Sequence, residues 1–513
     1  MTAEPSAAPP ELAARAAEKH VVVIGGGVGG LIAARECAKV GMRVTLLESA
    51  DAVGGAIRRV ELDGVVVDAG AESYATRGGH VRELLGELGL TDRIVAPDAG
   101  KAWLAGIPGV GAAPLPVGGI LGIPGNPFQD DVRRIIGWSG AWRAYLDRVR
   151  PPLTIGHQLS LGRLVSSRMG DKVRDRLVAP VTTGVYSASP DDVDVDVAAP
   201  GLNAALTRVG SLSGAVQALR AEAAARATAG PTEAKAPGAA VEGLSGGMGV
   251  LVDALVADLV QLGADVRTGV EVQSIAKTDA TWRIAAKTAI ESGAEPEADP
   301  EADPESEPEL VDLTADAVIV ATAESAARSL LAPVVPALAA AESSSSPEVE
   351  IITLLLRAPR LQGAPRGTGV LTVPGSHTAK ALTHSTAKWS WVRDAAGDRH
   401  VVRVSFGAQG EAAATAGLDD DAAAALALRE ASALLGVPLG AETLVAAHRS
   451  RFVQSQPASI IGSGERRAAA RAAVQAAPGL AAVGSWLAGT GLAQVIPDAK
   501  DEADRLRRAL LWH

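Results

Sequence analysis

Short runs of branched apolar residues alternate along the chain with glycine-rich turns and with stretches of helical periodicity. The segment from His20 to Ala34 reads HVVVIGGGVGGLIAA, which predicts a strand, a tight turn and a helix. A second apolar strand is expected at Arg43 to Leu47, and a buried strand much later, at Asp316 to Thr322. Apolar residues recur at helical spacing in His80 to Val95 and in Val250 to Leu262. This mixture of buried strands and helices is typical of an α/β protein.

The glycine turn after the first strand is the strongest candidate for chemistry. Gly25, Gly27 and Gly30 occupy the G-x-G-x-x-G positions, where they allow a tight turn, close approach of the backbone to a pyrophosphate, and close packing of helix on strand. The helix N-terminus would then face the phosphates. Glu48 ends the second strand, 18 residues past Gly30, near the roughly 20-residue spacing of a carboxylate that binds an adenosine ribose. The pattern favours FAD or NAD over NADP, and a glycine-rich turn with a surface glutamate is the alternative interpretation.

The C-terminal half predicts a second, more antiparallel sheet, with strands at Glu350 to Arg357, Val370 to Val373 and Val401 to Phe406. The last strand, at Leu480, leads through a small-residue turn into a helix expected at Lys500 to Leu511, with Pro497 delaying its start.

Between the two sheets, residues 91–200 read as mostly helical. The aromatic residues of this region are expected mainly in the core, with stacking on a substrate as the alternative: Trp103, Trp138, Trp142 and Tyr145. Two low-complexity segments, 222–240 and 291–310, are expected to be flexible inserts. The second is rich in Pro and Glu and reads as a solvated loop between two hairpin strands, with an acidic recruitment segment as the alternative.

Composition narrows the classes of function. The chain of 513 residues is long enough for several domains, and its formal charge of −11 argues against a nucleic-acid partner. Cys37 is the single cysteine, which excludes an internal disulfide and a cysteine-rich metal site and fits a cytoplasmic protein. The scattered histidines suggest no metal. No secretory signal or transmembrane helix is expected, but peripheral membrane contact stays open around Pro114 to Phe128.

Several motifs together resemble one family. GGGVGGLIAA, the ES that ends the second strand, VGGAIR and DAGAESY follow one another as they do in the FAD-dependent porphyrinogen oxidases and in the wider flavin amine oxidase superfamily. Two further phrases resemble the porphyrinogen oxidases more specifically. LVAPVTTGVYSASP is similar to a pattern that ends in GVYAGDP, and ALTHSTAKW matches A-x-T-x-S-x-x-K-W.

The resemblance implies a Rossmann-like FAD-binding domain built from discontinuous segments, with a mixed-sheet substrate domain and a helical domain. The FAD-binding domain would comprise 18–90, 241–330 and 476–513. The helical domain, which would be able to associate with a membrane, would comprise 91–200, and the substrate domain 201–221 and 331–475. The family also implies non-covalent FAD surrounded by Gly25, Gly27, Val28, Gly29, Gly30, Glu48, Ser49, Gly55, Ala56, Arg58, Gly70, Ala71, Glu72, Ser73, Val272, Thr490, Gly491 and Leu492.

The implied reaction is oxidation of a porphyrinogen to a porphyrin in haem biosynthesis. Hydride would pass to the flavin, oxygen would be the acceptor, and hydrogen peroxide would be released. The bacterial coproporphyrinogen III oxidases are favoured over the protoporphyrinogen IX enzymes, and transfer of the product to a later haem-pathway enzyme is a further expectation. Because porphyrinogens carry propionates, three cations are candidate substrate ligands: Arg77, Lys101 and Lys388.

The chain departs from the family pattern at two places. The family's P-Q-Y-x-V-G-H stretch reads PASIIGS at residues 457–463, without the Tyr and the His, and its Pro-Asp-Cys reads Ala493-Gln494-Val495. Two other functions therefore stay open. One is a flavin amine oxidase, although Trp486 lacks the aromatic partner common there, and the other is a flavin-binding protein without turnover.

Overall fold

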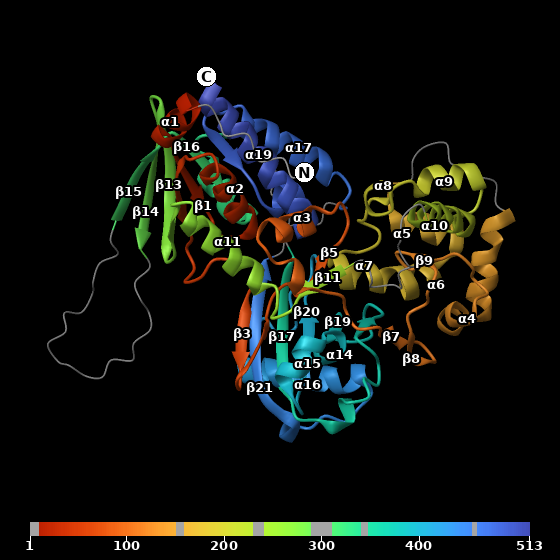
Figure 1. The fold of residues 1–513 in the computed structure, drawn as a ribbon. Helices are drawn as coiled ribbons and strands as arrows, with labels where there is room; N and C mark the ends of the chain where they lie inside the picture. Colours follow the sequence, from red (N-terminus) through yellow and green to blue (C-terminus); the bar gives the residue numbers. More distant parts are fainter. Residues whose placement is uncertain are drawn as a thin grey trace.

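The computed structural model describes residues 10–149, 159–228, 241–288, 310–339, 347–453 and 459–512. Figure 1 shows three bodies: a parallel sheet between helices, a mixed sheet, and a group of helices beside the mixed sheet. Among the helices described, none is both long and apolar enough to cross a bilayer.

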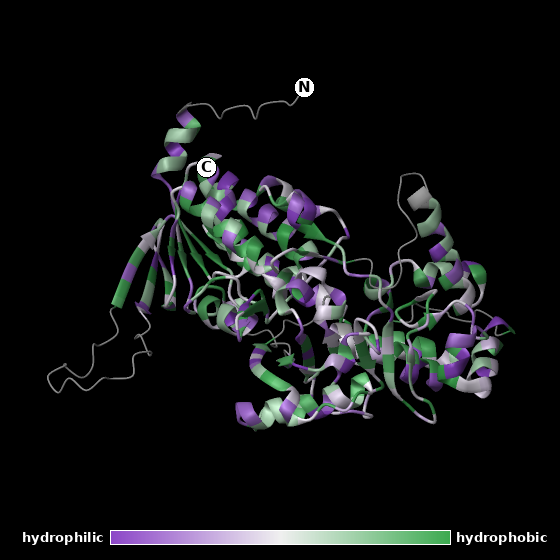
Figure 2. Cartoon of the chain, turned by 60° about the horizontal axis from the view of Figure 1, so that its bottom comes forward, coloured by the Kyte–Doolittle hydropathy of each residue, from purple (hydrophilic) through white to green (hydrophobic). Residues whose placement is uncertain are grey.

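The first body is built on a parallel sheet, in which the described strands lie in the order β12 (Asp265–Arg267), β2 (Arg43–Leu47), β1 (His20–Ile24), β16 (Ala317–Val320) and β22 (Leu480–Ala482). All residues of β1 and β16 are buried, and the centre of this sheet is correspondingly green in Figure 2. A parallel sheet needs apolar residues on both faces because layers of structure cover both.

Alternate residues of β1 belong to different cores, as the two-residue period of a strand requires. Val21 and Val23 pack with one set of helices, which comprises α1 (Pro10–Glu18), α2 (Val28–Ala38), α3 (His80–Glu87), α11 (Gly249–Gln261) and α19 (Leu492–Trp512). Val22 and Ile24 pack on the other side. The elements there are β13 (Val270–Thr278), β14 (Thr281–Thr288), β15 (Leu310–Ala315), α12 (Glu324–Leu331), α13 (Pro336–Ala339), α17 (Ser463–Gln475) and α18 (Ser485–Ala488).

The second body is a mixed sheet with the strand order β21 (Leu444–Val453), β17 (Glu348–Leu356), β20 (His400–Phe406), β19 (Ala381–His384), β18 (Gly369–Thr372), β7 (Ala102–Ile107) and β8 (Gly111–Pro114). Neighbouring strands are antiparallel except β18 and β7. One face packs against α16 (Asp420–Leu435). The opposite face packs in part against α14 (Ser385–Lys388), α15 (Ser390–Ala396) and the hairpin β3 (Arg59–Leu62) and β4 (Val65–Asp68).

The third body is helical and has its own apolar core. Its elements are α4 (Asp130–Tyr145), α5 (Leu161–Met169), α6 (Asp171–Val173), the π-helical turn η3 (Arg174–Val178), α7 (Ala179–Tyr186), α8 (Val195–Ala198), α9 (Leu202–Val209) and α10 (Leu212–Thr228). The hairpin β9 (Gly119–Ile120) and β10 (Ile123–Pro124) packs on it, and β5 (Tyr74–Ala75), β11 (Val241–Leu244) and β6 (Ile94–Val95) form a small sheet between the bodies. Short 3₁₀ turns lie at η1 (Thr91–Arg93), η2 (Leu146–Val149), η4 (Pro359–Leu361) and η5 (Ala441–Thr443).

The structure differs from the expected domain limits where tertiary pairing decides. Residues 94–124 form strands and connecting turns and no helix; β7 pairs in parallel with β18 and antiparallel with β8, so these two strands belong to the mixed sheet. Helices α9 and α10, expected in the substrate domain, pack in the helical core. Helix α17, also expected there, packs on the parallel sheet.

Two further expectations about helices were wrong. The expected flexible segment at 222–240 is helical as far as Thr228, because Ala, Glu and Arg favour helix, and the rest lies outside the described residues. The C-terminal helix begins at Leu492, so Pro497 lies inside it near its N-terminus. Residues 291–309 also lie outside the described part, but β14 and β15 on either side form the expected hairpin.

The aromatic residues of α4 are not core residues. Trp138 and Trp142 are 60% and 57% exposed, and Tyr145 is also exposed. Their rings gather around Phe128, with centroid distances of 6.4, 5.0 and 5.3 Å. The prediction failed because helical spacing shows which residues share a face and does not show whether another element covers that face.

Candidate functional site

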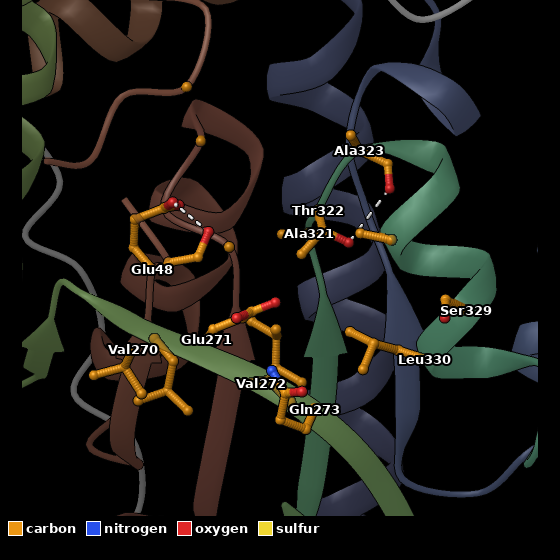
Figure 3. A pocket seen from close by; sticks show the side chains of 17 residues that line it. Glu48, Val270, Glu271, Val272, Gln273, Ala321, Thr322, Ala323, Ser329 and Leu330 are labelled. Carbon is orange, nitrogen blue, oxygen red and sulfur yellow. Dashed lines mark hydrogen bonds between the residues drawn. The ribbon is translucent and has the colours of Figure 1, made fainter. Parts of the chain in front are cut away.

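A cavity of about 500 Å³ opens where β1, β2 and β16 reach their carboxyl ends. Figure 3 shows Glu48 on one side, Ala321, Thr322 and Ala323 on the other, and Val272 with its neighbours from β13 below. Ligands of open parallel sheets bind at this edge. The residues that were predicted to bind cofactor and that line the cavity are Gly25, Gly27, Glu48, Ser49, Gly55 and Val272.

The glycine turn has the backbone geometry that its sequence predicts. Gly25 has a φ of +107°, and a Cβ there would lie 2.8 Å from the carbonyl carbon of Ala321. A Cβ at Gly30 would lie 2.0 Å from the carbonyl oxygen of Gly25, so a side chain would separate helix α2 from the turn. A Cβ at Gly27 would meet no protein atom within 4 Å. Gly27 thus leaves open space in front of the helix, where a phosphate can approach the backbone.

Glu48 closes the turn from the side of β2. Its Oε2 accepts a hydrogen bond of 2.6 Å from the amide of Gly26, and its Oε1 accepts from the amide of Ala50 at 2.8 Å and from the Ser49 hydroxyl at 3.3 Å. The carboxylate therefore lies at the mouth of the cavity between the glycine turn and the end of β2. That is the position from which a carboxylate accepts ribose hydroxyls in dinucleotide sites.

Two helix N-termini meet beside this turn. Helix α2 begins at Val28, and α19 begins at Leu492 after Gly489 and Gly491, whose φ angles are +99° and +104°. A Cβ at Gly29 would lie 3.2 Å from the side chain of Val495, so the two helices pack closely near their starts. The first N–H groups of a helix lack acceptors within it and attract negative charge.

Three loops are stacked between the parallel sheet and the mixed sheet: the glycine turn, the loop from Gly54 to Arg58, and the loop at residues 69–73. Gly54 donates to the carbonyl of Gly26 at 2.8 Å, and Ala71 donates to the carbonyl of Ala56 at 2.9 Å. A Cβ at Gly70 would lie 2.0 Å from that same Ala56 oxygen. The predicted residues of these loops therefore lie side by side, although Arg58 is exposed and donates from its Nε to the Gly55 carbonyl at 3.1 Å.

The third loop, residues 69–73, is joined to the mixed sheet by a buried ionic cluster. Arg403 of β20 donates to the carbonyl oxygens of Ala69, at 3.0 Å, and Gly70. Its Nη1 also lies 3.0 Å from Glu72, whose carboxylate contacts Lys388 at 2.5 Å and accepts from the Ser385 hydroxyl at 3.2 Å. We name Glu72, Lys388 and Arg403 the ionic cluster.

The pKa values of two carboxyl groups at this loop, those of Glu72 and Asp68, are shifted in opposite directions. Burial favours a higher pKa for Glu72, but the charges of Lys388 and Arg403 outweigh it and lower the pKa to about 2. Burial raises the pKa of Asp68 to about 6, against the hydrogen bonds from the Met248 amide at 2.9 and 3.1 Å and the charge of Arg403.

The three cations predicted to bind substrate lie in different surroundings. Within the described residues, Arg77 and Lys101 form no ion pair, and both are exposed. The charge of Arg77 opposes the rise that burial causes in the pKa of Tyr186, which places this guanidinium near the end of α7. Lys388 lies in the short helix α14, and its ammonium contacts the carboxylate of Glu72 at 2.5 Å.

Glu72, also predicted to bind the cofactor, turns its carboxylate to Arg403 and Lys388. The predicted residues that lie away from the cavity lining are Val28, Gly29, Gly30, Ala56, Arg58, Gly70, Ala71, Glu72, Ser73, Thr490, Gly491 and Leu492. They belong to the two helix starts and the stacked loops just described.

The face of the mixed sheet that carries Arg403 also carries half-buried side chains. Strand register places them on one face, because Thr383 lies opposite Arg403, Ser405 opposite Ala381, and Ala381 opposite Leu371. A Cβ at Gly184 of α7 would lie 2.5 Å from Leu371, so the helical body reaches the same face. We name the substrate face the half-buried residues Ile351, Leu371, Ala381, Thr383 and Ser405.

Sequence reasoning missed Arg403 and Lys380. Lys380 lies just before β19 and donates to the Ser187 hydroxyl at 2.7 Å, and burial lowers its pKa to about 8. Arg403 interrupts the apolar strand HVVRVSF, and a charged residue inside such a run is the signal that could have marked it.

The structure describes residues 459–463 and 493–495 of the two stretches that depart from the family pattern. Pro457 and Ala458 lie outside the described residues, whereas Ser459 is buried and accepts a backbone hydrogen bond from Asp194 through its carbonyl at 2.6 Å. Gln494 and Val495 donate to the Gly491 carbonyl at 3.1 Å and form the first turn of α19. The changed residues 493–495 therefore keep the helix start.

The groups around the cavity fit a dinucleotide. The open space at Gly27 adjoins the carboxylate of Glu48 and the start of α2, and backbone hydrogen bonds join the glycine turn to the loop at Gly54 and that loop to the loop 69–73. In the part of the chain that the structure describes, no group of three or more His, Cys, Asp or Glu side chains could hold a metal ion. The parallel sheet, the glycine turn and the cavity together are those of a dinucleotide-binding protein.

The sequence model of the protein family described as flavin containing amine oxidoreductase matches residues 28–507 of this chain. The chain belongs to this family, and it is a flavin-dependent oxidoreductase.

Known proteins are similar to it over nearly their full length. A coproporphyrinogen III oxidase of Propionibacterium freudenreichii is 27% identical over 96% of this chain and 91% of its own. One of Mycobacterium tuberculosis (strain H37Rv) is 29% identical over 92% and 93%. Among solved structures, a putative protoporphyrinogen oxidase from Exiguobacterium has a TM-score of 0.77 at 22% identity, covering 96% of this chain and 99% of that one. Putrescine oxidase bound to putrescine has a TM-score of 0.60 at 15% identity, with 96% and 99% covered. These two structures establish a common fold.

Proposed function

We propose that this protein oxidises coproporphyrinogen III to coproporphyrin III, with non-covalent FAD as cofactor and oxygen as acceptor. The observation that carries the proposal is the similarity, over more than 90% of each chain, to coproporphyrinogen III oxidases from two genera. The stacked loops support it, because they lead from the nucleotide cavity to a sheet face with half-buried side chains.

FAD would bind with its adenosine between Val272 and Glu48 and its diphosphate at Gly27 and the start of α2. Its ring would lie between the loop 69–73 and the start of α19. When bound, the flavin would supply the redox chemistry, which is a six-electron oxidation in three two-electron steps, and each step transfers two hydrogens from the macrocycle to one oxygen molecule as hydrogen peroxide. The protein orients the two rings and keeps water out. The N–H groups at the start of α19 would stabilise negative charge on the reduced ring.

The substrate would lie on the substrate face, with its apolar macrocycle against Leu371 and Ile351. Its propionates need cations, and of the three candidate cations Arg77 and Lys101 form no ion pair in the described structure, whereas Lys388 is paired with Glu72. Arg77→Ala should raise KM about tenfold or more and leave kcat nearly unchanged, because a charge-assisted hydrogen bond formed equally in ground and transition states is lost. Arg133→Ala, remote in the helical body, is the matched control.

The test of the function uses the purified full chain loaded with FAD. Growth of porphyrin fluorescence is followed with coproporphyrinogen III and, separately, with protoporphyrinogen IX. Hydrogen peroxide is measured in air and under nitrogen. We expect faster growth with coproporphyrinogen III and peroxide in step with the porphyrin. A preference for protoporphyrinogen IX would replace the substrate, and no growth with either on flavin-loaded protein would refute the proposal.

Two competing functions are separated by the same material. Peroxide formed with a primary amine or polyamine, and not with a porphyrinogen, would identify a flavin amine oxidase. Flavin that is bound and is reduced by neither substrate would identify a protein without turnover. The fold alone is shared by all three.

We further propose that the protein acts in the cytoplasm and contacts the membrane peripherally through an aromatic patch, defined as Phe128, Trp138, Trp142 and Tyr145. Trp and Tyr are enriched where proteins meet the bilayer interface. Arg133 stacks 4.3 Å above Trp138, and Arg148 lies 5.5 Å from the centroid of Tyr145, so cations border the rings. Such a border favours anionic lipid although the whole chain is acidic.

Co-sedimentation with phosphatidylglycerol-containing and pure phosphatidylcholine vesicles tests the membrane contact. We expect binding to the anionic vesicles that is lost in a Trp138→Ala/Trp142→Ala variant. Trp512→Ala is the control, because Trp512 is similarly exposed at 59% but lies at the end of α19. Binding that both variants retain would refute the contact. Capture of the patch by a later enzyme of haem synthesis, with no vesicle binding, would instead favour product transfer.

A further inference from the structure

The ionic cluster joins segments that are far apart in the sequence. Glu72 lies in the loop between β4 and β5, Lys388 in α14 and Arg403 in β20. The side chains of Glu72 and Arg403 are 11% and 7% exposed, so water does little to screen the pair. An ionic group buried to this degree is retained only where its geometry is well satisfied.

Arg403 makes the cluster a connection between backbones. Besides Glu72 it binds the carbonyl oxygens of Ala69 and Gly70, so one guanidinium holds three acceptors of the same loop. That loop is packed on Ala56, where Gly70 has no room for a side chain. A change at Arg403 or at its carboxylate partner therefore moves the loop relative to the substrate face, which Arg403 shares with Thr383 and Ser405.

The charges of the cluster do not cancel. Two cations face one carboxylate, which leaves the three-residue cluster with one net positive charge. Asp68, held by the Met248 amide, also faces Arg403 and Glu72, and its negative charge offsets that positive charge once its carboxyl, with a pKa of about 6, is ionised. Charge close to a flavin ring changes the energy of its reduced form relative to its oxidised form.

We propose that Glu72, Lys388 and Arg403 are positioning residues that fix the flavin-facing loop to the substrate face and set the charge beside the ring. The proposal rests on the proposed function only in taking the loop 69–73 as flavin-facing. It assigns Lys388 to the cofactor side of the site and not to the substrate carboxylates.

The test exploits the sign of the charge. Glu72→Gln adds one positive charge to the cluster and Lys388→Met removes one, whereas the double variant keeps the wild-type net charge. With FAD bound, the reduction potential should rise in Glu72→Gln, fall in Lys388→Met and return close to the wild-type value in the double variant. A role confined to packing would not give shifts of opposite sign.

Flavin affinity and turnover give the second readout. Glu72→Gln should raise the dissociation constant of FAD about tenfold and lower kcat by up to about 100-fold with little change in KM, because a displacement of about 1 Å at the reacting groups has that effect. If Glu72→Gln does not fold, Lys388→Met still decides, because it keeps the Glu72 carboxylate on Arg403 and should lower the flavin potential, whereas a role confined to packing leaves the potential unchanged.

Glu350→Gln is the matched control. Glu350 is paired with Arg449 in the same mixed sheet, and the two side chains are 6% and 4% exposed. Strand register, however, places Arg449 opposite Ile352, on the face that packs against α16. This control should lower the melting temperature without moving the flavin potential.

Potential shifts of the same sign in the two single variants, no shifts, or equal shifts in Glu350→Gln would overturn the proposal. These outcomes are separate from the proposed function, because neither the flavin potential nor the FAD dissociation constant involves a porphyrinogen. Failure to oxidise porphyrinogens with the expected potential shifts would refute the function and leave the positioning role intact.

Discussion

Two glycines three residues apart should respond to the same substitution in different ways. Gly30→Ala places a Cβ 2.0 Å from the Gly25 oxygen, a contact that must open by about 1 Å or more. Both partners belong to buried backbone, and every residue of α2 is buried, so the helix cannot yield locally. Overpacking of this kind costs about 1–3 kcal/mol, which for a chain of 513 residues corresponds to a fall of about 1–3 °C in the melting temperature.

Gly27→Ala adds the same methyl group in open space. Gly27 has a φ of −65° and a ψ of +167°, which alanine adopts without strain, and its Cβ would meet no protein atom within 4 Å. The apoprotein should therefore melt at the wild-type temperature. The methyl group occupies the approach to the diphosphate, so the dissociation constant of FAD should rise about 100-fold, equivalent to about 2.7 kcal/mol.

The assay is thermal unfolding of each apoprotein with and without added FAD, together with flavin titration by fluorescence quenching. Wild type should be stabilised by FAD through mass action. Gly27→Ala should start equally stable and gain little, whereas Gly30→Ala should start lower. Equal FAD stabilisation of Gly27→Ala and wild type would refute the placement of the diphosphate. An apoprotein of Gly30→Ala as stable as wild type would refute the steric argument.

Three further predictions concern pH and buried charge, each measured by chemical unfolding across pH. The pKa of Glu72 is lowered to about 2 from 4.5, so the stabilisation that Glu72 contributes is present above pH 4.5 and is lost as the pH falls towards 2. This loss amounts to about 3 kcal/mol in the free energy of unfolding, and Glu72→Gln should abolish it. The pKa of Asp68 is raised to about 6 from 3.8, so the folded state binds the proton more tightly and stability should fall as the pH rises from 3.8 to 6; a curve that is unchanged in Asp68→Asn would contradict this. The pKa of Lys380 is lowered to about 8 from 10.5, so the stability of the protein should rise as the pH rises from 8 to 10.5. At pH 7, Lys380→Met should be more stable than the wild type by about 2 kcal/mol. A destabilised variant would indicate that the hydrogen bond to Ser187 outweighs the cost of burying the charge.

Local signals in the sequence predicted much of the nucleotide end of the site. Gly25, Gly27 and Gly30 were identified because their roles depend on backbone geometry that few other residues permit. Glu48 was identified by its distance in sequence, since a strand of fixed length brings its end to the turn. The strands β1, β2 and β16 were predicted because buried parallel strands are apolar on both faces.

The other end of the site could not be read from the sequence. In the sequence, Arg403 looks like an isolated charge in a strand, and Lys388 looks like a cation suited to a propionate. Their partner Glu72 is more than 300 residues away, at separations of 331 and 316. The exposure of Trp138 and Trp142 has the same origin, because a helical period is compatible with a covered or an uncovered face.

The amino-acid sequence by itself determined the glycine turn, the carboxylate at the end of the second strand and the class of fold, because each depends on backbone conformation and spacing within a short segment. Only the tertiary structure decided that Glu72 faces Arg403 and Lys388, that β7 joins the mixed sheet, and that the aromatic rings of α4 lie at the surface. Those features depend on which distant segments pack together, and contacts of that kind leave no periodic signal along the chain.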